Sequence, residues 1–153
     1  MASRARKRFP PEMTGTDRWV RFKLARRGNG KLAKVPVQLN GRNASSTDPA
    51  TWCSFHDASR SAVGDGLGWV LGAGIGCLDL DDCFGVEGRL SEFAQSVIEE
   101  HQGQAILIER SLSGKGVHIF VPMEQGAGAV RAGIEVYPPD SGRFIAVTGD
   151  RLR

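Results

Sequence analysis

Hydrophobic and polar residues alternate along several short stretches of this chain, and such alternation predicts β-strands. Residues 18–24 alternate charged and apolar side chains, and 33–37 follow after the turn signal Gly28-Asn29-Gly30, which together predict a basic hairpin. Trp19 is expected in the core, and Pro36 should place the second strand of this hairpin at a sheet edge. Further short strands are expected at 67–71, 75–82, 105–109, 117–121, 133–137 and 143–149.

Two other segments carry apolar residues at helical spacing. The first is expected to begin at Asp48-Pro49, a good N-cap and first-turn pair, and to run to about residue 62; the second should begin at Ser91. The residues expected on their buried sides are Trp52, Phe55 and Ala58, then Phe93, Ala94, Val97 and Ile98. The glycines at 72–76 lack dinucleotide-binding spacing and precede a strand, so a tight hairpin turn is expected there.

Composition bounds the class of protein. A hydrophobic content of 41% with 24% charged residues is ordinary for a globular protein, and 153 residues leave little room for a second domain. No apolar run approaches the ~20 residues of a membrane span, and the basic N-terminus lacks the apolar core of a signal peptide. Three scattered cysteines fit no zinc or disulfide pattern, so we expect reduced thiols and a cytoplasmic location.

The net charge of +3 hides an asymmetry. Residues 1–35 hold eleven Lys and Arg against two acids, a balance of +9, while the remainder is at −6. For residues 4–8 a solubilising tail is the preferred interpretation, whereas the hairpin is expected to contact the phosphates of a nucleic acid. The candidate nucleic-acid-binding residues are Arg18, Arg21, Lys23, Arg26, Arg27, Lys31 and Lys34.

Residues 75–82 form a predicted buried strand that carries acids. Alternation puts Asp79 and Asp81 on one face with Cys77, while Leu78 and Leu80 lie on the other. Two neighbouring carboxylates repel each other, and a divalent cation such as Mg²⁺ or Mn²⁺ relieves that repulsion. The alternative is a strand that simply runs out into an acidic loop.

Residues 111–118 lie between two predicted strands and contain Ser113, Lys115 and His118. The P-loop spacing fails here, and a strand follows instead of a helix. A glycine-containing turn with a hydroxyl, an ammonium and an imidazole can still hold phosphate oxygens, although a polar turn with a lone half-buried histidine is the alternative. A third acid, Glu135, lies within the apolar strand at 133–137.

These three features, in this order, resemble the archaeo-eukaryotic primase superfamily, and specifically the primase–polymerase domain at the N-terminus of phage and plasmid replication proteins. The acid-x-acid pair Asp79-Leu80-Asp81 is similar to its first motif, residues 113–118 to an extended form of its Ser-x-His motif, and Ile134-Glu135 to its third. The resemblance covers residues 17–149. Flanking similarities are Trp19-Val20, Lys34-x-Pro36, 47–52 and 143–149.

The resemblance implies an α+β (mixed α/β) fold with an RRM-like sheet and a second small α/β module around one catalytic cleft. It implies a template-dependent DNA primase and DNA polymerase that adds NTPs or dNTPs on a single-stranded DNA template in phage or plasmid replication, with two Mg²⁺ or Mn²⁺ ions. The implied catalytic, metal-binding residues are Asp79, Asp81 and Glu135, and the implied nucleotide-binding residues are Ser113, Lys115, His118 and Arg143.

On this basis residues 17–149 are the expected catalytic domain, preceded by a flexible basic tail at 1–16 and followed by a short end at 150–153. Such domains usually sit in longer chains, so the partners expected are DNA, nucleotides, and a helicase or a C-terminal helical domain that is absent here; no membrane partner is expected. We therefore expect an excised domain or a minimal relative.

Two alternatives from other classes remain open. One is a catalytically silent module that binds single-stranded nucleic acid. The other is a rolling-circle nickase, which needs a tyrosine nucleophile and usually a histidine pair. Tyr137 is the sole tyrosine, and His56, His101 and His118 are not closely spaced, so we rank the nickase last.

Overall fold

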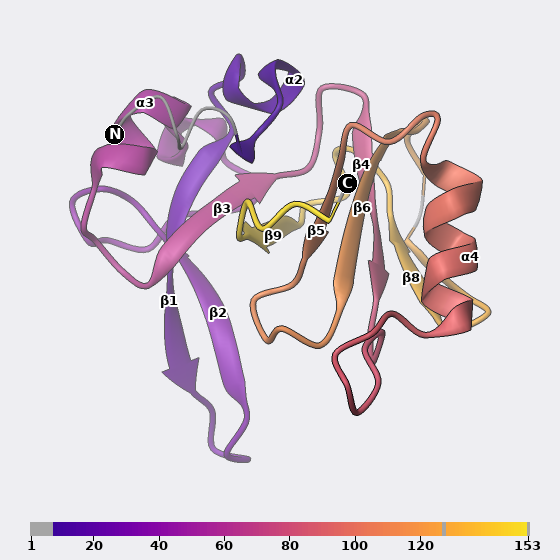
Figure 1. Ribbon diagram of the computed structural model, residues 1–153. Helices are drawn as coiled ribbons and strands as arrows, with labels where there is room; N and C mark the ends of the chain where they lie inside the picture. Colours follow the sequence, from indigo (N-terminus) through magenta and orange to yellow (C-terminus); the bar gives the residue numbers. More distant parts are fainter. Residues whose placement is uncertain (1–7, 127, 153) are drawn as a thin grey trace.

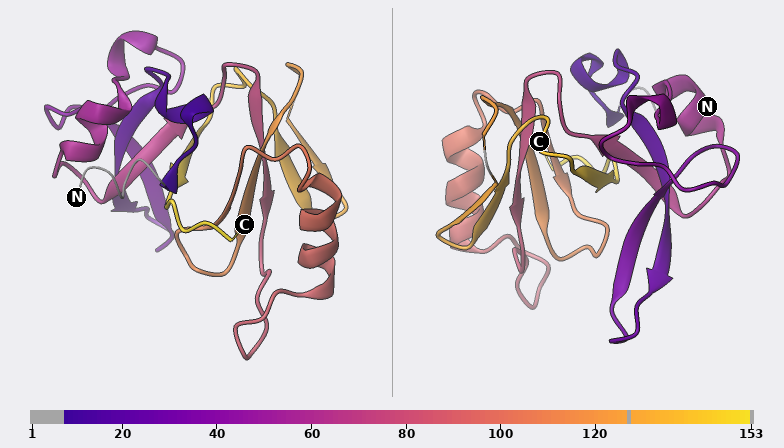
Figure 2. Two further views of the ribbon diagram at one scale, coloured as in Figure 1. Left: turned by 45° about the horizontal axis from the view of Figure 1, so that its top comes forward. Right: turned by 180° about the vertical axis from the view of Figure 1, so that it is seen from behind.

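The computed structural model describes residues 8–126 and 128–152. In this part of the chain, two antiparallel β-sheets lie side by side, and few residues are helical (Figure 1). The expected mixed α+β class is therefore confirmed. The views of Figure 2 show the longest helix on the face of the second sheet that points away from the first. None of the described helices is long and apolar enough to cross a membrane.

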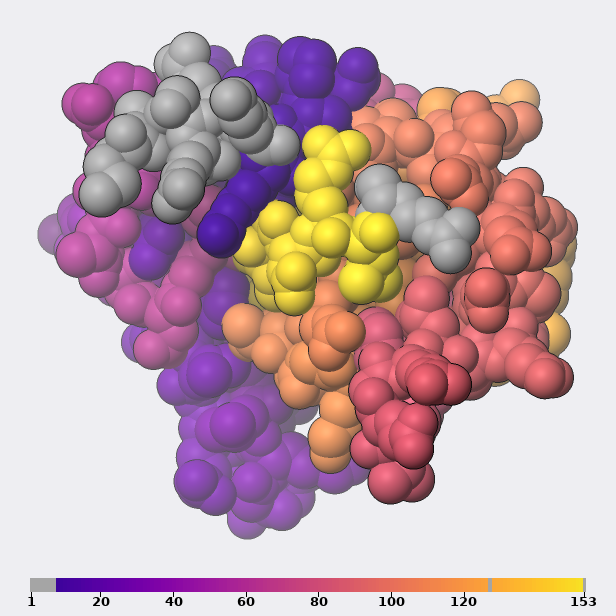
Figure 3. All heavy atoms as spheres, viewed as in Figure 1, coloured from indigo at the N-terminus to yellow at the C-terminus, as the bar shows by residue number. Residues whose placement is uncertain are grey.

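The first sheet has the strand order β2-β1-β3-β9. Its strands are β1 (Trp19–Arg26), β2 (Leu32–Val37), β3 (Gly66–Val70) and β9 (Phe144–Val147). The expected basic hairpin is β1–β2. Pro36 lies on the edge strand β2, as expected, and pairs with Phe22 on β1. The tip of this hairpin protrudes from the body of the molecule (Figure 3).

The second sheet has the strand order β5-β6-β4-β8-β7. Its strands are β4 (Ile75–Leu80), β5 (Leu107–Arg110), β6 (Val117–Pro122), β7 (Ala129–Arg131) and β8 (Ile134–Tyr137), and α4 (Glu92–His101) connects β4 to β5. Ser91 caps α4 as expected, because its hydroxyl accepts the Ala94 N–H. Phe93 was expected on the buried side of this helix but is exposed. Strand β7 was not expected, because all three of its residues are exposed and its sequence shows no alternation of apolar and polar residues.

The helix expected from residue 48 to 62 is two separate elements. Asp48 caps only the short 3₁₀ turn η1 (Pro49–Thr51), and α3 (Phe55–Arg60) begins afresh after Ser54, whose hydroxyl accepts the Asp57 N–H. Trp52 therefore lies in the extended link between the two elements, where its indole N–H donates to the Ser45 carbonyl oxygen.

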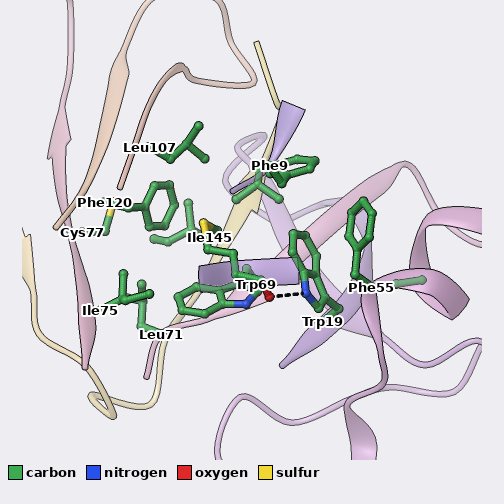
Figure 4. Close-up of a cluster of buried hydrophobic side chains, with 13 residues drawn as sticks. Phe9, Trp19, Phe55, Trp69, Leu71, Ile75, Cys77, Leu107, Phe120 and Ile145 are labelled. Atoms are coloured by element: carbon green, nitrogen blue, oxygen red, sulfur yellow. Dashed lines mark hydrogen bonds between the residues drawn. The ribbon is translucent and has the colours of Figure 1, made fainter. Parts of the chain in front are cut away.

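The residues just before β1 are packed against the body, which corrects the expected tail through residue 16. Helix α2 (Pro11–Thr14) inserts Met13, fully buried, and Phe9 is buried beside it. The Trp19 indole N–H donates to the Met13 carbonyl oxygen at 3.0 Å, and the Phe9, Trp19 and Phe55 rings meet edge to face (Figure 4). The part of the expected tail at residues 1–7 lies outside the described residues.

The tight turn expected at 72–76 is present, because the Ile75 N–H donates to the Gly72 carbonyl oxygen, but the strands that it joins do not pair with each other. β3 and β4 belong to different sheets, and the chain crosses between them at this point. A side chain at Gly72 would displace the Arg18 guanidinium, because an added Cβ would lie 1.9 Å from it. That guanidinium donates to the carbonyl oxygens of Val70 and Leu71 and holds the crossover in place.

Strand β4 contributes to two hydrophobic cores, one on each of its faces. Cys77 faces the core between the two sheets, together with Trp69 and Phe120. Leu78 and Leu80 face the core beneath α4. The alternation predicted for this strand is thus confirmed, and Asp79 faces the same side as Cys77, at the margin of the core between the sheets.

Candidate active site between the two sheets

Four polar side chains form one row across the second sheet. Asp79 on β4 pairs directly with His118 on β6 and with Glu135 on β8, and His118 in turn pairs with Glu109 on β5. Residues directly opposite each other in a ladder point to the same face, so all four side chains face the first sheet. The neighbouring row consists of Leu107, Phe120, Cys77 and Tyr137.

His118 is almost fully buried, with 5% of its side chain exposed, and its ring has a fixed orientation. Its Nδ1 lies 2.9 Å from a carboxylate oxygen of Glu109, and its Nε2 lies 3.7 Å from Oδ1 of Asp79. Both oxygens of Glu109 already accept backbone N–H groups from Thr148 and Gly149, so the hydrogen of the contact belongs to Nδ1. Nε2 therefore faces Asp79 and the space beyond it.

The carboxyl group of Asp79 is partly buried, with a quarter of its side chain exposed. Burial raises its pKa above the ordinary value of 3.8, His118 and Lys34 lower it, and Asp81 and Glu135 raise it again. The net effect is a raised pKa, as expected of an acid placed among other acids at the edge of a core.

Glu135 is tied to Tyr137, a neighbour that was not expected in the site, and Tyr137 in turn contacts Arg143, which was. The Tyr137 hydroxyl donates to a carboxylate oxygen of Glu135, and the Arg143 guanidinium lies 4.5 Å from the centre of the Tyr137 ring. Burial, followed by the contact with Glu135, raises the pKa of the Tyr137 hydroxyl well above its ordinary value of 10.

A cavity of about 310 Å³ opens over this row, between the two sheets. It is lined by Asp79, His118 and Tyr137 from the second sheet and by residues 142–146 at the start of β9. Lys34 on β2 and Ser46 line its other side. Acidic and basic side chains thus face each other across a space large enough for a small polyanion.

A second cavity, of about 450 Å³, lies beyond Tyr137 and Arg143, which line both spaces. Glu135 and the β7–β8 hairpin line the second one, and Ser141 contributes a hydroxyl that is buried without a hydrogen-bond partner. Tyr137 and Arg143 therefore lie at the boundary between two cavities, one lined by Asp79 and the other by Glu135.

Several residues expected in the site line neither cavity. Asp81 follows the end of β4 and is exposed. Ser113 and Lys115 are exposed in the β5–β6 turn, where the Ser113 hydroxyl accepts the Lys115 N–H. The structure therefore brings His118, Asp79, Glu135 and Arg143 together, whereas Ser113 and Lys115 of the expected phosphate turn line neither cavity.

The seven basic residues expected to bind nucleic acid fall into three groups. Arg18 and Arg21 donate to backbone carbonyl oxygens within the fold, which gives both a structural role. Lys34 reaches the cavity beside Asp79. The remaining four are exposed along the protruding hairpin: Lys23, Arg26, Arg27 and Lys31.

The acids have the oxygen donors that a hard divalent cation prefers. Among residues 8–126 and 128–152, however, no three His, Cys, Asp or Glu side chains lie close enough together to hold an ion. Glu135 points to Tyr137 instead. The donor chemistry fits Mg²⁺ or Mn²⁺, but the side chains of Asp79, Asp81 and Glu135 do not converge on one point.

Sequence reasoning missed Glu109, the placement of Lys34 and the role of Tyr137 in the site. Glu109 ends an apolar strand at a position where alternation would bury it, and that signal was available. The position of Lys34 depends on how the two sheets face each other, which no local pattern encodes.

No protein-family model matches this chain. The chain is similar to a DNA primase-polymerase from Nitratiruptor phage NrS-1, with 30% identity over 151 aligned residues. The alignment covers 86% of this chain and 19% of the phage protein, so the chain spans about a fifth of the length of that relative. A named DNA primase-polymerase thus carries, in one segment, a sequence similar to almost all of this chain.

Proposed function

We propose that this chain is the catalytic domain of a template-dependent nucleotidyltransferase, a DNA primase and polymerase that acts on single-stranded DNA. The observation that carries the proposal is the row of Asp79, Glu135 and His118, in which Asp79 and His118 line a cavity with Lys34 and Arg143 and Glu135 lines the adjoining one. The similarity to a phage DNA primase-polymerase supports the same activity. Replication of a phage or plasmid is the corresponding setting, with the chain working in the cytoplasm.

The incoming nucleotide triphosphate would occupy the cavity between the sheets. Lys34 and Arg143 provide fixed positive charge on two sides of it, and His118 presents Nε2 from its floor. A triphosphate held by several charged groups is oriented for in-line attack, and such positioning is most of what phosphoryl transfer requires of a protein. Ser113 and Lys115 would contact the outer phosphates from the β5–β6 turn.

Asp79, Asp81 and Glu135 would hold the divalent cations, after Glu135 turns away from Tyr137. Such ions, when bound, supply charge that favours attack of a primer 3′-hydroxyl on the α-phosphate. The mutual repulsion of the acids, which raises the pKa of Asp79, is the condition that a cation relieves.

The β1–β2 hairpin would carry the template. The hairpin protrudes from the body (Figure 3), four of its basic residues are exposed, and Lys34 on the same hairpin lines the cavity. The template strand would thus be held within reach of the bound nucleotide.

The topology of the second sheet supports the RRM-like module that the family resemblance implies. Four of its strands lie in the spatial order β5-β6-β4-β8, and α4 connects β4 to β5 along the chain. This is the order of a β-α-β-β-α-β unit, here with the short strand β7 in place of the second helix. The first sheet, with β9, forms the other wall of the cleft.

Primer extension tests the proposal. The wild type, incubated with a labelled primer–template, Mg²⁺ or Mn²⁺, and dNTPs or NTPs in separate reactions, is expected to extend the primer. Asp79→Asn should lower extension at least 10²-fold, because it removes a carboxylate from the centre of the row. Chelation by EDTA should abolish extension by the wild type.

Asp82→Asn is the matched control. Asp82 is exposed, lies outside the row, and has a positive φ that asparagine tolerates, so the variant should extend primers like the wild type. Equal extension by Asp79→Asn and Asp82→Asn would contradict the proposed mechanism. Extension by neither variant nor the wild type, under all four combinations of metal and nucleotide, would contradict the activity itself.

A second candidate is a catalytically silent module that binds single-stranded nucleic acid. The contact between Tyr137 and Glu135 favours it, because this contact keeps the third acid away from the other two. This candidate requires salt-sensitive DNA binding without dependence on divalent metal and without triphosphate binding. A rolling-circle nickase has less support, because the Tyr137 hydroxyl donates to Glu135 and His101 lies at the end of α4 rather than beside His118.

A further inference from the structure

The outer part of the β1–β2 hairpin has two chemically different faces. β3 ends opposite Phe22, so beyond this residue the hairpin consists of strands β1 and β2 alone. Its register pairs Leu24 with Lys34 and Arg26 with Leu32. Residues directly opposite each other point to the same face, as do alternate residues along a strand, so these four side chains share one face. We call this surface the leucine face.

The leucine face carries the exposed apolar side chains of this hairpin. Leu24 is 39% exposed and Leu32 is 59% exposed, and they lie diagonally across the ladder from each other. The opposite face consists of Lys23 paired with Val35 and of two paired alanines, and in these described strands no large apolar side chain of that face is exposed. Exposed apolar and basic side chains therefore alternate on one face only.

The leucine face leads to the cavity between the sheets. Leu24 is directly opposite Lys34, which lines that cavity together with Asp79. Arg26 and Leu32 form the next pair outward on this face, towards the protruding tip of the hairpin (Figure 3). A DNA strand that pairs with a nucleotide in the cavity and then follows the leucine face outward stays in contact with the protein.

Leucine and arginine side chains bind different parts of a DNA strand. A guanidinium contacts phosphates, which single strands and duplexes both expose. The flat apolar faces of the bases are accessible in a single strand but are covered by stacking in a duplex, and burying them against leucine side chains removes apolar surface from water. An exposed apolar pair beside basic residues therefore fits a single strand better than a duplex.

We propose that Leu24 and Leu32 contact unstacked bases of the template while Arg26 contacts its phosphates, so that the leucine face selects single-stranded over double-stranded DNA. This inference rests on the proposed function, because that function makes a DNA template the ligand of the hairpin. It assigns to two leucines a selectivity that basic residues alone do not supply.

Fluorescence anisotropy with a labelled oligo-dT, and with a blunt duplex of the same length, tests the proposal. The double variant Leu24→Thr/Leu32→Thr keeps residues that favour strands and removes most of the exposed apolar surface. It should bind the single strand about tenfold more weakly, with an unchanged slope of log K against log [salt], and should bind the duplex like the wild type. Leu39→Thr, which changes a leucine of similar exposure (36%) beyond the end of β2, should alter neither affinity.

The charged residues of the hairpin provide a comparison between its faces. Arg26→Ala should weaken binding of both DNA forms and lower the salt slope for the single strand by about 0.7, the value of one lost phosphate contact. Lys23→Ala removes the same charge from the opposite face and should have a smaller effect on both affinities. Equal effects of these two variants would overturn the assignment of the template to the leucine face.

Circular dichroism of each variant establishes that it is folded, and Leu32→Thr alone, at the more exposed position, replaces the double variant if the latter does not fold. A folded leucine variant that binds the single strand like the wild type would overturn the proposal and leave the leucines for a protein partner. An equal loss of affinity for both DNA forms would overturn it as well.

DNA binding is measured here independently of catalysis, so the two proposals can fail separately. A wild type that shows the expected differences from its variants but extends no primer would contradict the proposed polymerase activity and still support the leucine face. A wild type that extends primers, with variants that show none of these differences, would contradict the leucine face alone.

Discussion

Asp79 shows how a residue can serve a site and oppose the stability of the fold. Its carboxyl group lies at the margin of the core between the sheets, directly opposite His118 and Glu135. Because its pKa is higher in the folded protein than the ordinary 3.8, the folded state prefers the protonated form. The loss of stability therefore begins as the pH rises above 3.8 and is complete above the pKa in the folded state.

Asp79→Asn should accordingly stabilise the metal-free protein at pH 7, by about 0.5–2 kcal/mol in the free energy of unfolding, the usual gain when a functional strain is removed. The gain should shrink as the pH falls through the raised pKa towards 3.8, because the wild-type carboxyl group becomes neutral as well. Urea denaturation in EDTA at pH 7 and near pH 4 measures both values. A variant that is less stable than the wild type at pH 7 would contradict this account.

At the scale of residues, sequence reasoning placed Asp79, Glu135 and His118, because each interrupts an apolar strand with a polar side chain. It did not recognise Glu109, although this acid lies within an apolar strand at a position where alternation would bury it. It also named Ser113 and Lys115 as nucleotide-binding residues, which stays a prediction; both are exposed in the β5–β6 turn and line neither cavity.

Helix α2 is the element with the largest difference between expectation and structure. A basic N-terminus with Pro10-Pro11 resembles a tail, and four helical residues are too few to produce a periodic pattern. Met13 and Phe9 nevertheless complete the core around Trp19. This segment is ordered by packing against Trp19 and Phe55, a tertiary contact that no local sequence pattern encodes.

Met13→Ala should therefore lower the free energy of unfolding by about 2–5 kcal/mol, the usual cost of emptying a fully buried position of this size. The hydrogen bond from Trp19 goes to the Met13 backbone carbonyl oxygen and should persist in the variant. Glu12→Ala, exposed on the same helix, is the control and should change stability by less than about 0.5 kcal/mol. Chemical denaturation of the three proteins provides the comparison, and equal stability would mean that α2 does not contribute to the core.

The strands were largely predictable, because alternation and glycine-containing turns are local signals. Their assembly into two sheets was not. The glycines at 72–76 seemed to reverse the chain within one sheet, but they carry it from the first sheet to the second, and the site lies between those sheets.

At the scale of the whole molecule, exposed basic side chains lie along the protruding β1–β2 hairpin while Asp79 and Glu135 line the cavities, and these parts should respond differently to mutation. Lys31→Ala, near the hairpin tip, should weaken binding of single-stranded DNA and reduce the slope of log K against log [salt] by about 0.7, the value of one lost phosphate contact. Lys34→Ala, three residues away but in the cavity, should instead raise the KM for the nucleotide.

Fluorescence anisotropy at several salt concentrations, together with nucleotide titration of primer extension, separates the two effects. If both variants changed DNA binding and left the KM unchanged, Lys34 would be a template-binding residue, as the sequence alone predicted.

The row across the second sheet also bears on how such a site evolves. Glu109, His118, Asp79 and Glu135 are joined by hydrogen-bonded ladders, so their alignment depends on strand register and on the odd or even position of each residue in its strand. The number of residues between strands is unconstrained as long as the register is kept. Insertions in the intervening loops can therefore accumulate without moving the chemistry, while a single-residue slip within a strand would turn its functional side chain to the opposite face. Distant relatives should thus be recognised more readily by the parity of polar residues within their strands than by the spacing of motifs along the chain.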